Sequence, residues 1–316
     1  MKVSLVVTVL NEEPSIAALL ESIISQLKKP DEIVIVDGGS TDKTVNIIKS
    51  YQKVIKNLKL YEFKTTRSEA RNIGIDASSG NIIVTTDAGC VAEKHWIEKI
   101  TKPFYEPKVD MVAGFYEMIG GNSSLRLAMS VFIGITPDKF DDRFLASARS
   151  LAFRKDLWEK VGGFPEGLKD TAEDTLFNYK IITTGAKIVR VKDAVVYWQL
   201  PLTLTEGIKK MYLYAKGDAL SGIWWHPVKK LSTHNIKIIS VYLRYVIGIY
   251  ILLMATKYEL FNLLFVLGIF FYMFWAFKKV YCRTNSFKAG LWGVIIQFAS
   301  DIAVMGGLFS GLISRK

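Results

Sequence analysis

The chain has 316 residues, and 50% of them are hydrophobic, which is enough for one large or two ordinary domains. Residues 1–200 hold 27 Lys and Arg against 26 Asp and Glu, whereas residues 201–316 hold 14 against 4. A basic half with long apolar runs favours an anionic membrane surface as partner and disfavours nucleic acid. The two cysteines, Cys90 and Cys282, indicate neither a disulfide framework nor a zinc site.

The N-terminal stretch lacks the layout of a cleavable signal, because its apolar run is short and breaks into acidic residues. We therefore expect the first part of the chain to lie in the cytoplasm. Short β-branched, apolar runs alternate with segments whose apolar residues recur at helical spacing. The expected strands are 3–10, 32–36, 58–63, 82–86, 109–118 and 148–153, with helices between the first four, at 122–135 and from Glu173. This alternation predicts an α/β fold with a mostly parallel, Rossmann-like sheet and right-handed crossovers.

Polar residues follow three of these strands at the point where each ends. Asn11 and Glu12 follow the first strand, Asp37 follows the second and Asp87 the fourth. Open α/β sheets bind their ligands at the carboxyl ends of the strands, so these side chains predict a nucleotide crevice. A strand-end Asp is often only a turn-former, which is the simpler reading of each acid taken alone. Neither G-x-G-x-x-G nor a P-loop motif occurs, which disfavours dinucleotide redox and P-loop chemistry.

Five motifs now occur in a fixed order along residues 1–200. They are V-V-T-V-L-N-E-E (6–13), I-V-I-V-D-G-G-S-T-D (33–42), E-A-R-N-I-G-I (69–75), T-T-D-A-G-C (85–90) and A-E-D-T-L-F (172–177). Together they resemble the family 2 glycosyltransferases of the GT-A fold. The resemblance implies an inverting transfer of a sugar from a nucleotide-sugar donor, usually with Mg²⁺ or Mn²⁺. We expect the donor to be a UDP- or GDP-sugar.

The resemblance also implies which residues hold the donor. Asp37 would accept hydrogen bonds from the base or ribose, and Arg71 would reach the base or pyrophosphate. A solvated surface position is the simpler interpretation of Arg71. The implied donor-binding residues are Thr8, Leu10, Asn11, Glu12, Asp37, Arg71, Asp87, Ala88 and Gly89.

Asp87 matches the first acid of the family's D-x-D motif, which would hold a hard divalent cation against the diphosphate. The chain departs from the pattern at Gly89, which has no side chain to ligate a metal. Asp87 could then act directly, through water, or on the ribose. His226 could supply a further ligand, although a lone His is more often structural.

The acid pair Glu173-Asp174 matches the acceptor side of the family's site. The resemblance makes Asp174 the general base and Glu173 a residue that positions the acceptor. Acids in a first helical turn are otherwise partners of the helix dipole. A lipid phosphate acceptor is already ionised, and Asp174 would then orient groups or support a cation. The expected acceptor-side and membrane-side residues are Arg149, Trp224, Trp225, Lys229 and Lys230.

After residue 200 the chain changes character. The stretch 204–221 suits a helix lying along the membrane interface, and residues 201–237 as a whole are expected to form amphipathic interface helices. Three apolar segments, about 238–256, 260–277 and 289–313, are each near or above the length needed to cross a bilayer. The three segments predict about three spans. Lys and Arg at 278–288 place the link between the second and third spans in the cytoplasm, so the first span leaves, the second returns and the third leaves again. Asp301 lies inside the third segment and either pairs within the bundle or faces a headgroup.

These features predict a multi-pass protein of the cell membrane: a cytoplasmic catalytic domain (1–200), interface helices (201–237) and a transmembrane domain (238–316). The expected acceptor is a membrane lipid such as a polyprenyl (dolichyl) phosphate or a lipid-linked glycan. A soluble or polysaccharide acceptor stays open. The processive members carry Q-x-x-R-W, which is absent here, so transfer of one sugar is favoured. A catalytically silent scaffold and a nucleotidyltransferase are the alternatives, and homo-oligomer formation is left open.

Overall fold

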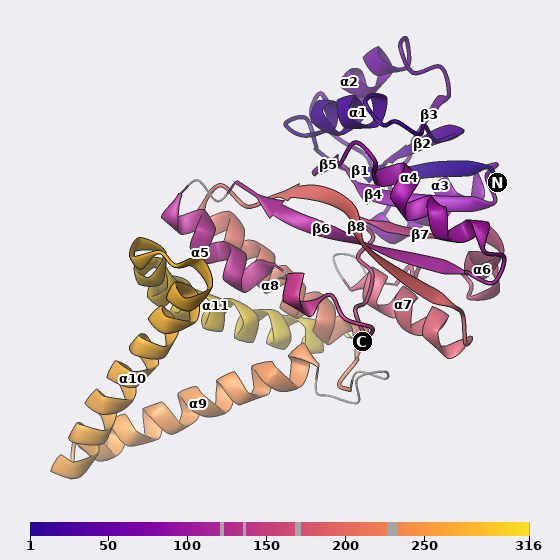
Figure 1. Cartoon of the computed structure of the whole chain (residues 1–316). Helices are drawn as coiled ribbons and strands as arrows, with labels where there is room; N and C mark the ends of the chain where they lie inside the picture. The colour runs from indigo at the N-terminus through magenta and orange to yellow at the C-terminus, as the bar shows by residue number, and fades with distance from the viewer. Residues whose placement is uncertain (121–122, 135–136, 168–171, 226–232, 316) are drawn as a thin grey trace. The chain divides into compact units, whose positions relative to one another are not determined.

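The computed structural model describes residues 1–120, 123–134, 137–167, 172–225 and 233–315. The chain divides into two compact units (Figure 1). The first unit consists of residues 1–119 and 137–199, and the second of residues 120–136 and 200–316. The segment 120–136 therefore belongs to the second unit, although it lies between two strands of the first unit in sequence.

The first unit is built on an eight-stranded sheet of order β3-β2-β1-β4-β7-β6-β8-β5. The chain builds β1, β2 and β3 outward on one side and then crosses to place β4 on the other side of β1. These four strands are parallel, whereas β7 pairs antiparallel with both β4 and β6. The strands are β1 Val3–Val9, β2 Glu32–Asp37, β3 Leu58–Glu62, β4 Ile82–Asp87, β5 Cys90–Ala92, β6 Met111–Ile119, β7 Leu151–Arg154 and β8 Ile188–Gln199.

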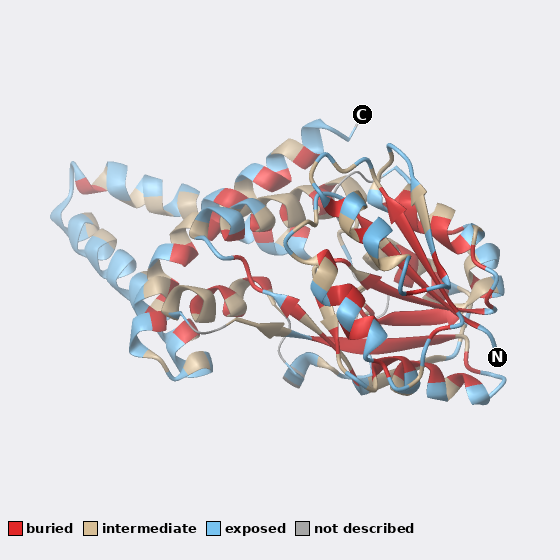
Figure 2. Cartoon of the chain, turned by 90° about the horizontal axis from the view of Figure 1, so that it is seen from above, coloured by how far each residue is buried: buried red, intermediate tan, exposed pale blue. Residues whose placement is uncertain are grey.

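Apolar runs explain the central strands, because β1, β2 and β4 are buried along nearly their whole length (Figure 2). Helix α3 packs on β1 and β2, and Gly74 allows this close approach. The helices of this unit are α1 Ile16–Ile24, α2 Thr44–Tyr51, α3 Arg67–Asp76, α4 Trp96–Thr101, α6 Lys155–Lys160 and α7 Glu173–Thr183, with 3₁₀ turns η1 Lys102–Tyr105 and η2 Pro137–Lys139.

The predicted fold class, a mostly parallel α/β sheet followed by long helices, is confirmed. The sequence reading missed β8, a long strand that pairs in parallel with β6. Charged residues at 190, 192 and 193 break the apolar pattern of β8, and a register shift interrupts its pairing with β6. The short elements β5, α4 and α6 were also missed.

The second unit is helical. Its helices are α5 Ser124–Ile133, α8 Leu204–Ser221, α9 His234–Ala255, α10 Glu259–Thr284 and α11 Phe287–Ile313. Helices α9, α10 and α11 are each long and apolar enough to cross a membrane. Small residues bring α8 and α11 together: a Cβ added at Gly307 would lie 2.4 Å from the carbonyl oxygen of Tyr212. Such contacts are typical of closely packed membrane helices.

Asp301 of α11 is 2% exposed and lies at the centre of a polar network joining three helices. Its Oδ2 accepts hydrogen bonds from Arg244 at 2.7 Å and Tyr245 at 3.2 Å, and from the hydroxyl of Tyr272. Its Oδ1 accepts one from Gln297 at 3.0 Å. Of the two roles left open for Asp301, pairing within the bundle is therefore the one observed.

Replacement of Gly74 by Ala tests the packing of α3 on the sheet. The added Cβ would lie 2.7 Å from Cγ1 of Val6 and 3.1 Å from Cγ2 of Val36. We expect overpacking to cost about 1–3 kcal/mol of unfolding free energy, against about 1 kcal/mol of helix propensity gained. Thermal denaturation of the full chain in detergent measures this. Gly167→Ala is the matched control, because a Cβ there meets nothing within 4 Å; equal melting temperatures of the two variants would contradict the close approach.

Candidate functional site

Two strand-end acids flank the central strand β1. In the register of the sheet, Val9 pairs with Asp37 on one side, and Thr8 pairs with Asp87 on the other. Two interstrand spacings separate the two acids, which corresponds to roughly 10 Å between their backbones. The strand order reverses next to β1, which is where open α/β sheets form their ligand crevice.

Asp37 is 2% exposed and only half satisfied. Its Oδ2 accepts hydrogen bonds from the backbone N–H groups of Gly39 and Ser40, both at 2.9 Å. Its Oδ1 is buried and has no partner among the described residues. A buried acceptor left without a donor costs about 1–3 kcal/mol, so a ligand N–H or hydroxyl would relieve this cost.

The loop after β1 is fastened to the loop after β2. Asn11 has a positive φ of 54° and donates its N–H to Oγ of Ser40 at 2.8 Å. Its side-chain oxygen accepts the N–H of Thr41 at 2.8 Å. The N–H of Glu12 donates to Oγ1 of Thr44 at 2.8 Å. These bonds fix the backbone beside Asp37, while Leu10 stays 54% exposed.

Arg71 joins two acids that are far apart in sequence. Its Nη2 lies 2.8 Å from Oδ1 of Asp87, and its Nη1 lies 2.7 Å from Oε1 of Glu173. The guanidinium is held on α3, whose first turn is closed by a capping box between Thr66 and Glu69. The Arg71 side chain is 2% exposed and buried between the acids, so the simpler interpretation of a solvated surface position is wrong.

The charge of Arg71 sets the ionisation of both acids. Burial raises the pKa of Asp87, but the positive charges of Arg71 and Arg149 outweigh it and hold that pKa at about 2. Burial also raises the pKa of Glu173, and Arg71 outweighs it there too, so the pKa lies below its usual range. Both carboxylates are therefore ionised at neutral pH.

Arg149 approaches Asp87 from the other side. Its Nε lies 3.6 Å from Oδ2 of Asp87, and its guanidinium stacks over the rings of Tyr116 at 4.9 Å and Trp198 at 4.6 Å. Sequence reasoning missed both rings. Trp198 lies on the unrecognised strand β8. Sequence reasoning also missed Arg67, whose Nη1 lies 3.7 Å from Oε1 of Glu173.

Asp174 lies beside this charge cluster, in the first turn of α7. Its Oδ2 accepts the N–H of Ala148 at 3.4 Å. Burial, followed by the negative charge of Glu173, raises the pKa of Asp174 to about 6. The residue before the pair, Ala172, has a φ of 73°, a strained conformation for a non-glycine residue that is often found at functional sites. The structure thus brings Arg71, Asp87, Glu173 and Asp174 into one cluster.

Gly89 reduces the number of protein side chains that can ligate a metal ion. Within the described part of the chain, no group of three His, Cys, Asp or Glu side chains is arranged to hold a metal. A Cβ added at Gly89 would meet only Oε2 of Glu12, at 3.9 Å. Ala88 is buried. His226 lies outside the described residues.

The remaining predicted residues belong to the second unit. Trp224 is half-buried and Trp225 is 64% exposed, which suits a headgroup contact for the latter. Lys229 and Lys230 lie outside the described residues.

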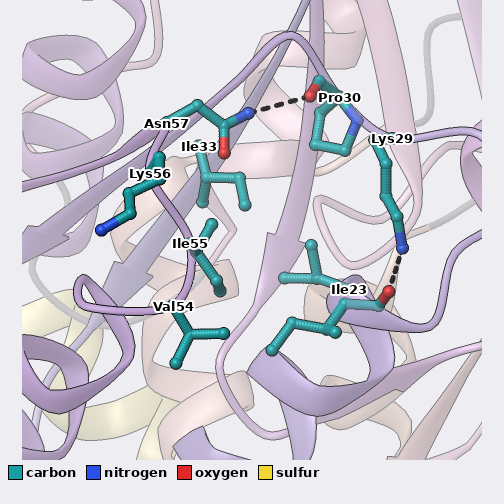
Figure 3. A pocket seen from close by; sticks show the side chains of 9 residues that line it. Ile23, Lys29, Pro30, Ile33, Val54, Ile55, Lys56 and Asn57 are labelled. Atoms are coloured by element: carbon teal, nitrogen blue, oxygen red, sulfur yellow. Dashed lines mark hydrogen bonds between the residues drawn. The ribbon is translucent and has the colours of Figure 1, made fainter.

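A separate cavity of about 260 Å³ opens at the other edge of the sheet (Figure 3). Ile23, Ile33, Val54 and Ile55 line it, and Asn57 donates to the carbonyl of Pro30 at 3.1 Å. It lies at the amino end of β2, away from Asp37, and has no acidic lining residue, so it does not form part of the candidate site.

The sequence matches the pattern of Glycosyl transferase family 2 over residues 4–161. It is 32% identical over 173 residues to glycosyltransferase AglE of Haloferax volcanii, covering 52% of this chain and 57% of that protein. It is 31% identical over 140 residues to a dolichyl N-acetyl-alpha-D-glucosaminyl phosphate 3-beta-D-2,3-diacetamido-2,3-dideoxy-beta-D-glucuronosyltransferase of Methanococcus voltae, covering 41% of this chain and 44% of that protein. The matches thus span about half the length of these relatives.

Two solved structures share the fold. The mannosyltransferase PcManGT from Pyrobaculum calidifontis, in complex with GDP-Man and Mn²⁺, superposes with a TM-score of 0.63 at 21% identity, over 94% of this chain and 86% of that chain. Residues 1–349 of TarS from S. aureus, in complex with UDP, superpose with a TM-score of 0.54 at 22% identity, over 73% of this chain and 68% of that chain.

Replacement of Arg71 by Met tests the ion-pair cluster. The buried Glu173 and the partly exposed Asp87 would each lose their nearest cationic partner, while Arg67 and Arg149 stay at 3.7 Å and 3.6 Å. We therefore expect a loss of up to about 3–5 kcal/mol in unfolding free energy at pH 7. Asp87 and Glu173 have depressed pKa values, so their contribution is present above their usual pKa and is lost as the pH falls toward about 2. The difference from wild type should therefore persist from pH 7 to about 5 and shrink as the pH falls from about 4 toward 2.

Melting temperatures of the full chain across this pH range measure the effect. Arg67→Met is the control, because Arg67 is 51% exposed and lies 3.7 Å from Glu173, and exposed pairs contribute about 0–1 kcal/mol. If Arg71→Met melted no lower than Arg67→Met, Arg71 would not be the charge that compensates Asp87 and Glu173.

Proposed function

The chain belongs to glycosyltransferase family 2, and we propose that it moves one sugar, with inversion, from a nucleoside diphosphate sugar to a lipid acceptor. The observation that carries the proposal is the cluster in which Arg71 links Asp87 to Glu173, with Asp174 beside them. This cluster and Asp37 lie at the carboxyl ends of the strands around β1, where a nucleotide ligand is expected.

The donor would lie across the end of β1. The unpartnered Oδ1 of Asp37 suits an N–H of the base or a ribose hydroxyl. Asp87, roughly 10 Å away, would lie near the diphosphate. The relatives of known structure carry UDP in one case and GDP-Man in the other. We accordingly propose a UDP- or GDP-sugar as donor.

The described residues fit a cation completed by the substrate and do not form a preformed protein site. Mg²⁺ is commonly bound by one or two carboxylates together with substrate phosphates. Asp87 would be the principal protein ligand, with Glu12 close to the gap left by Gly89. Such a cation would neutralise charge on the departing nucleoside diphosphate. Arg71 and Arg149 would keep Asp87 ionised for this task.

Asp174 would act on the acceptor. A pKa of about 6 leaves the carboxylate ionised at neutral pH yet basic enough to take a proton from a hydroxyl group. Glu173, held by Arg71, would keep a negative charge beside it and position the acceptor. Two adjacent carboxyl groups with pKa values pushed apart are a recurring arrangement in acid–base catalysis.

A lipid acceptor is supported by the C-terminal unit and by one relative. The catalytic part is followed in sequence by three helices long and apolar enough to cross a membrane. The relative from Methanococcus voltae acts, by its name, on a sugar linked to dolichyl phosphate. We propose a polyprenyl phosphate or a lipid-linked glycan as acceptor, with the catalytic unit in the cytoplasm of a membrane-anchored protein.

Transfer is tested by incubating native membranes with a panel of radiolabelled UDP- and GDP-sugars. We expect label in the lipid fraction from one donor, and much less with Asp87→Ala or Asp174→Ala. Label that stayed entirely water-soluble would contradict a lipid acceptor. Equal activity of all three proteins would remove the catalytic assignment and favour a silent scaffold, the alternative suggested by Gly89.

The isosteric variant Asp174→Asn tests the general base. We expect turnover to fall by about 10²–10⁴-fold with a hydroxyl acceptor. In the wild type, turnover should rise with pH to a plateau above about pH 6, because the base must be deprotonated. The variant should lose this dependence. Glu159→Gln, an exposed acid on α6, is the control. A loss below about tenfold would contradict proton abstraction by Asp174 and would indicate an ionised phosphate acceptor.

The variant Gly89→Asp tests the incomplete metal motif. A side chain at this position meets open space and lies near Glu12, so a second carboxylate can be added. We expect Mn²⁺ to bind about tenfold more tightly in the presence of UDP or GDP, which corresponds to about 1.4 kcal/mol. Titration calorimetry measures this. Gly167→Asp, which adds the same charge outside the site, should leave affinity unchanged; an unchanged affinity in Gly89→Asp would argue against a cation at Asp87.

A further inference from the structure

Helix α9 begins beside the end of helix α11. Ile238, in the second turn of α9, and Leu308, near the end of α11, belong to one buried cluster. The hydroxyl of Tyr242 donates to the carbonyl of Met305 at 2.6 Å. The start of α9 and the end of α11 therefore lie at the same level within this unit.

Helix α8 also ends beside the start of α9 and the end of α11. A Cβ at Gly311 of α11 would lie 2.6 Å from Cβ of Ala219, and a Cβ at Gly222 would meet the guanidinium of Arg315. Asp218 Oδ2 lies 3.0 Å from Nδ1 of His234, the first residue of α9. Helix α8 precedes α9 and follows the first unit in sequence, so this place lies on the side from which the chain enters the membrane.

Helix α10 ends where α11 begins, since only Asn285 and Ser286 separate them. The two helices then contact each other close to this link. A Cβ at Gly290 would lie 2.5 Å from the ring of Phe277, and one at Gly293 would lie 2.6 Å from Cγ2 of Val280. Figure 1 shows the turn between α9 and α10 at the far end of the unit, away from α8 and α11.

These contacts determine whether the number of membrane crossings is even or odd. The path along α9, α10 and α11 returns to the level at which α9 began. A path that returns to its starting side crosses a membrane an even number of times. Three crossings are therefore incompatible with the contacts between α8, α9 and α11, and at least one of the three helices does not cross.

The charges select which helix this is. The link between α10 and α11 is flanked by Lys278, Lys279, Arg283 and Lys288, and Arg315 follows α11. The turn between α9 and α10 carries only Lys257 and, next to it, Glu259. Basic residues concentrate on the cytoplasmic side, so both ends of α11 belong there and the α9–α10 turn belongs on the opposite side.

The burial of the helices agrees with this choice. In their most apolar windows, 11% of α9 and 6% of α10 are buried, whereas 44% of α11 is buried. Six of the exposed residues of α11 form one apolar stripe and are spaced four or seven residues apart: Phe287, Leu291, Ile295, Ile302, Phe309 and Ile313. Such a one-sided helix suits a position in the plane of the interface.

We propose that α9 and α10 alone cross the bilayer, and that α11 lies in the cytoplasmic leaflet with its apolar stripe toward the hydrocarbon. Helices α9 and α10 also expose many large apolar side chains, and lipid is the occupant that suits the exposed apolar residues of all three helices. The bonds from Arg244 and Tyr272 to Asp301 anchor the middle of α11 to both crossing helices. This topology differs from the three spans that composition predicted, and it does not depend on the proposed reaction.

Cysteine labelling of the full chain in intact cells tests the topology. In a Cys282→Ser background, Lys257→Cys should react with an impermeant maleimide from outside, and Ser314→Cys should react only after permeabilisation. Cys90 is buried, so it should not contribute. Wild-type Cys282, exposed near the end of α10, is the cytoplasmic control. Labelling of Ser314→Cys from outside, or failure to label Lys257→Cys there, would overturn the proposal.

The depth of α11 gives a second measurement that does not depend on labelling. Nitroxide spin labels at Ile295 and Phe309, both exposed on the stripe, should report nearly equal depths from their accessibility to oxygen and to a water-soluble nickel complex. A spanning α11 would separate the two positions by about 20 Å along the bilayer normal, at about 1.5 Å per residue. Such a separation would overturn the proposal.

Discussion

The arrangement of the first unit depends on one buried guanidinium. Arg71 is held on α3 and donates to Asp87 at the end of β4 and to Glu173 at the start of α7. These three elements are far apart in sequence, and their charges meet only because the sheet and α3 are in place. A buried ion pair is costly unless its partners are well placed, so this cluster is weak evidence for stability and stronger evidence for a fixed constellation of charges.

This constellation separates the ionisation of neighbouring acids. Asp87 lies against two guanidinium groups and has a pKa of about 2, whereas Asp174, next to the negative Glu173, has a pKa of about 6. Asp87 is thereby suited to stay ionised and bind a cation, and Asp174 is suited to take up a proton. Asp37 adds a buried oxygen, Oδ1, that accepts no hydrogen bond from the described residues. The site thus differs from a set of structural ion pairs, in which each charge is fully satisfied.

The second unit shows how little hydropathy alone says about topology. Helices α9, α10 and α11 are all long and apolar enough to cross a membrane. Their contacts differ, because glycines let α11 approach α8 and α10 closely, while α9 and α10 expose apolar side chains on most sides. Which helix faces lipid all round, and which only on one stripe, follows from packing.

The sequence by itself determined the α/β class, the parallel core strands and the strand-end positions of Asp37 and Asp87, because buried strands and their turns are local patterns. It also determined the apolar C-terminal helices and, through five ordered motifs, the family. Tertiary structure decided what local patterns do not encode. The partners of Arg71, the stacking of Arg149 on Tyr116 and Trp198, and the partners of Asp301 all join residues distant in sequence. Strand β8 escaped recognition because its charged residues break the alternation and pairing with β6 stabilises it instead.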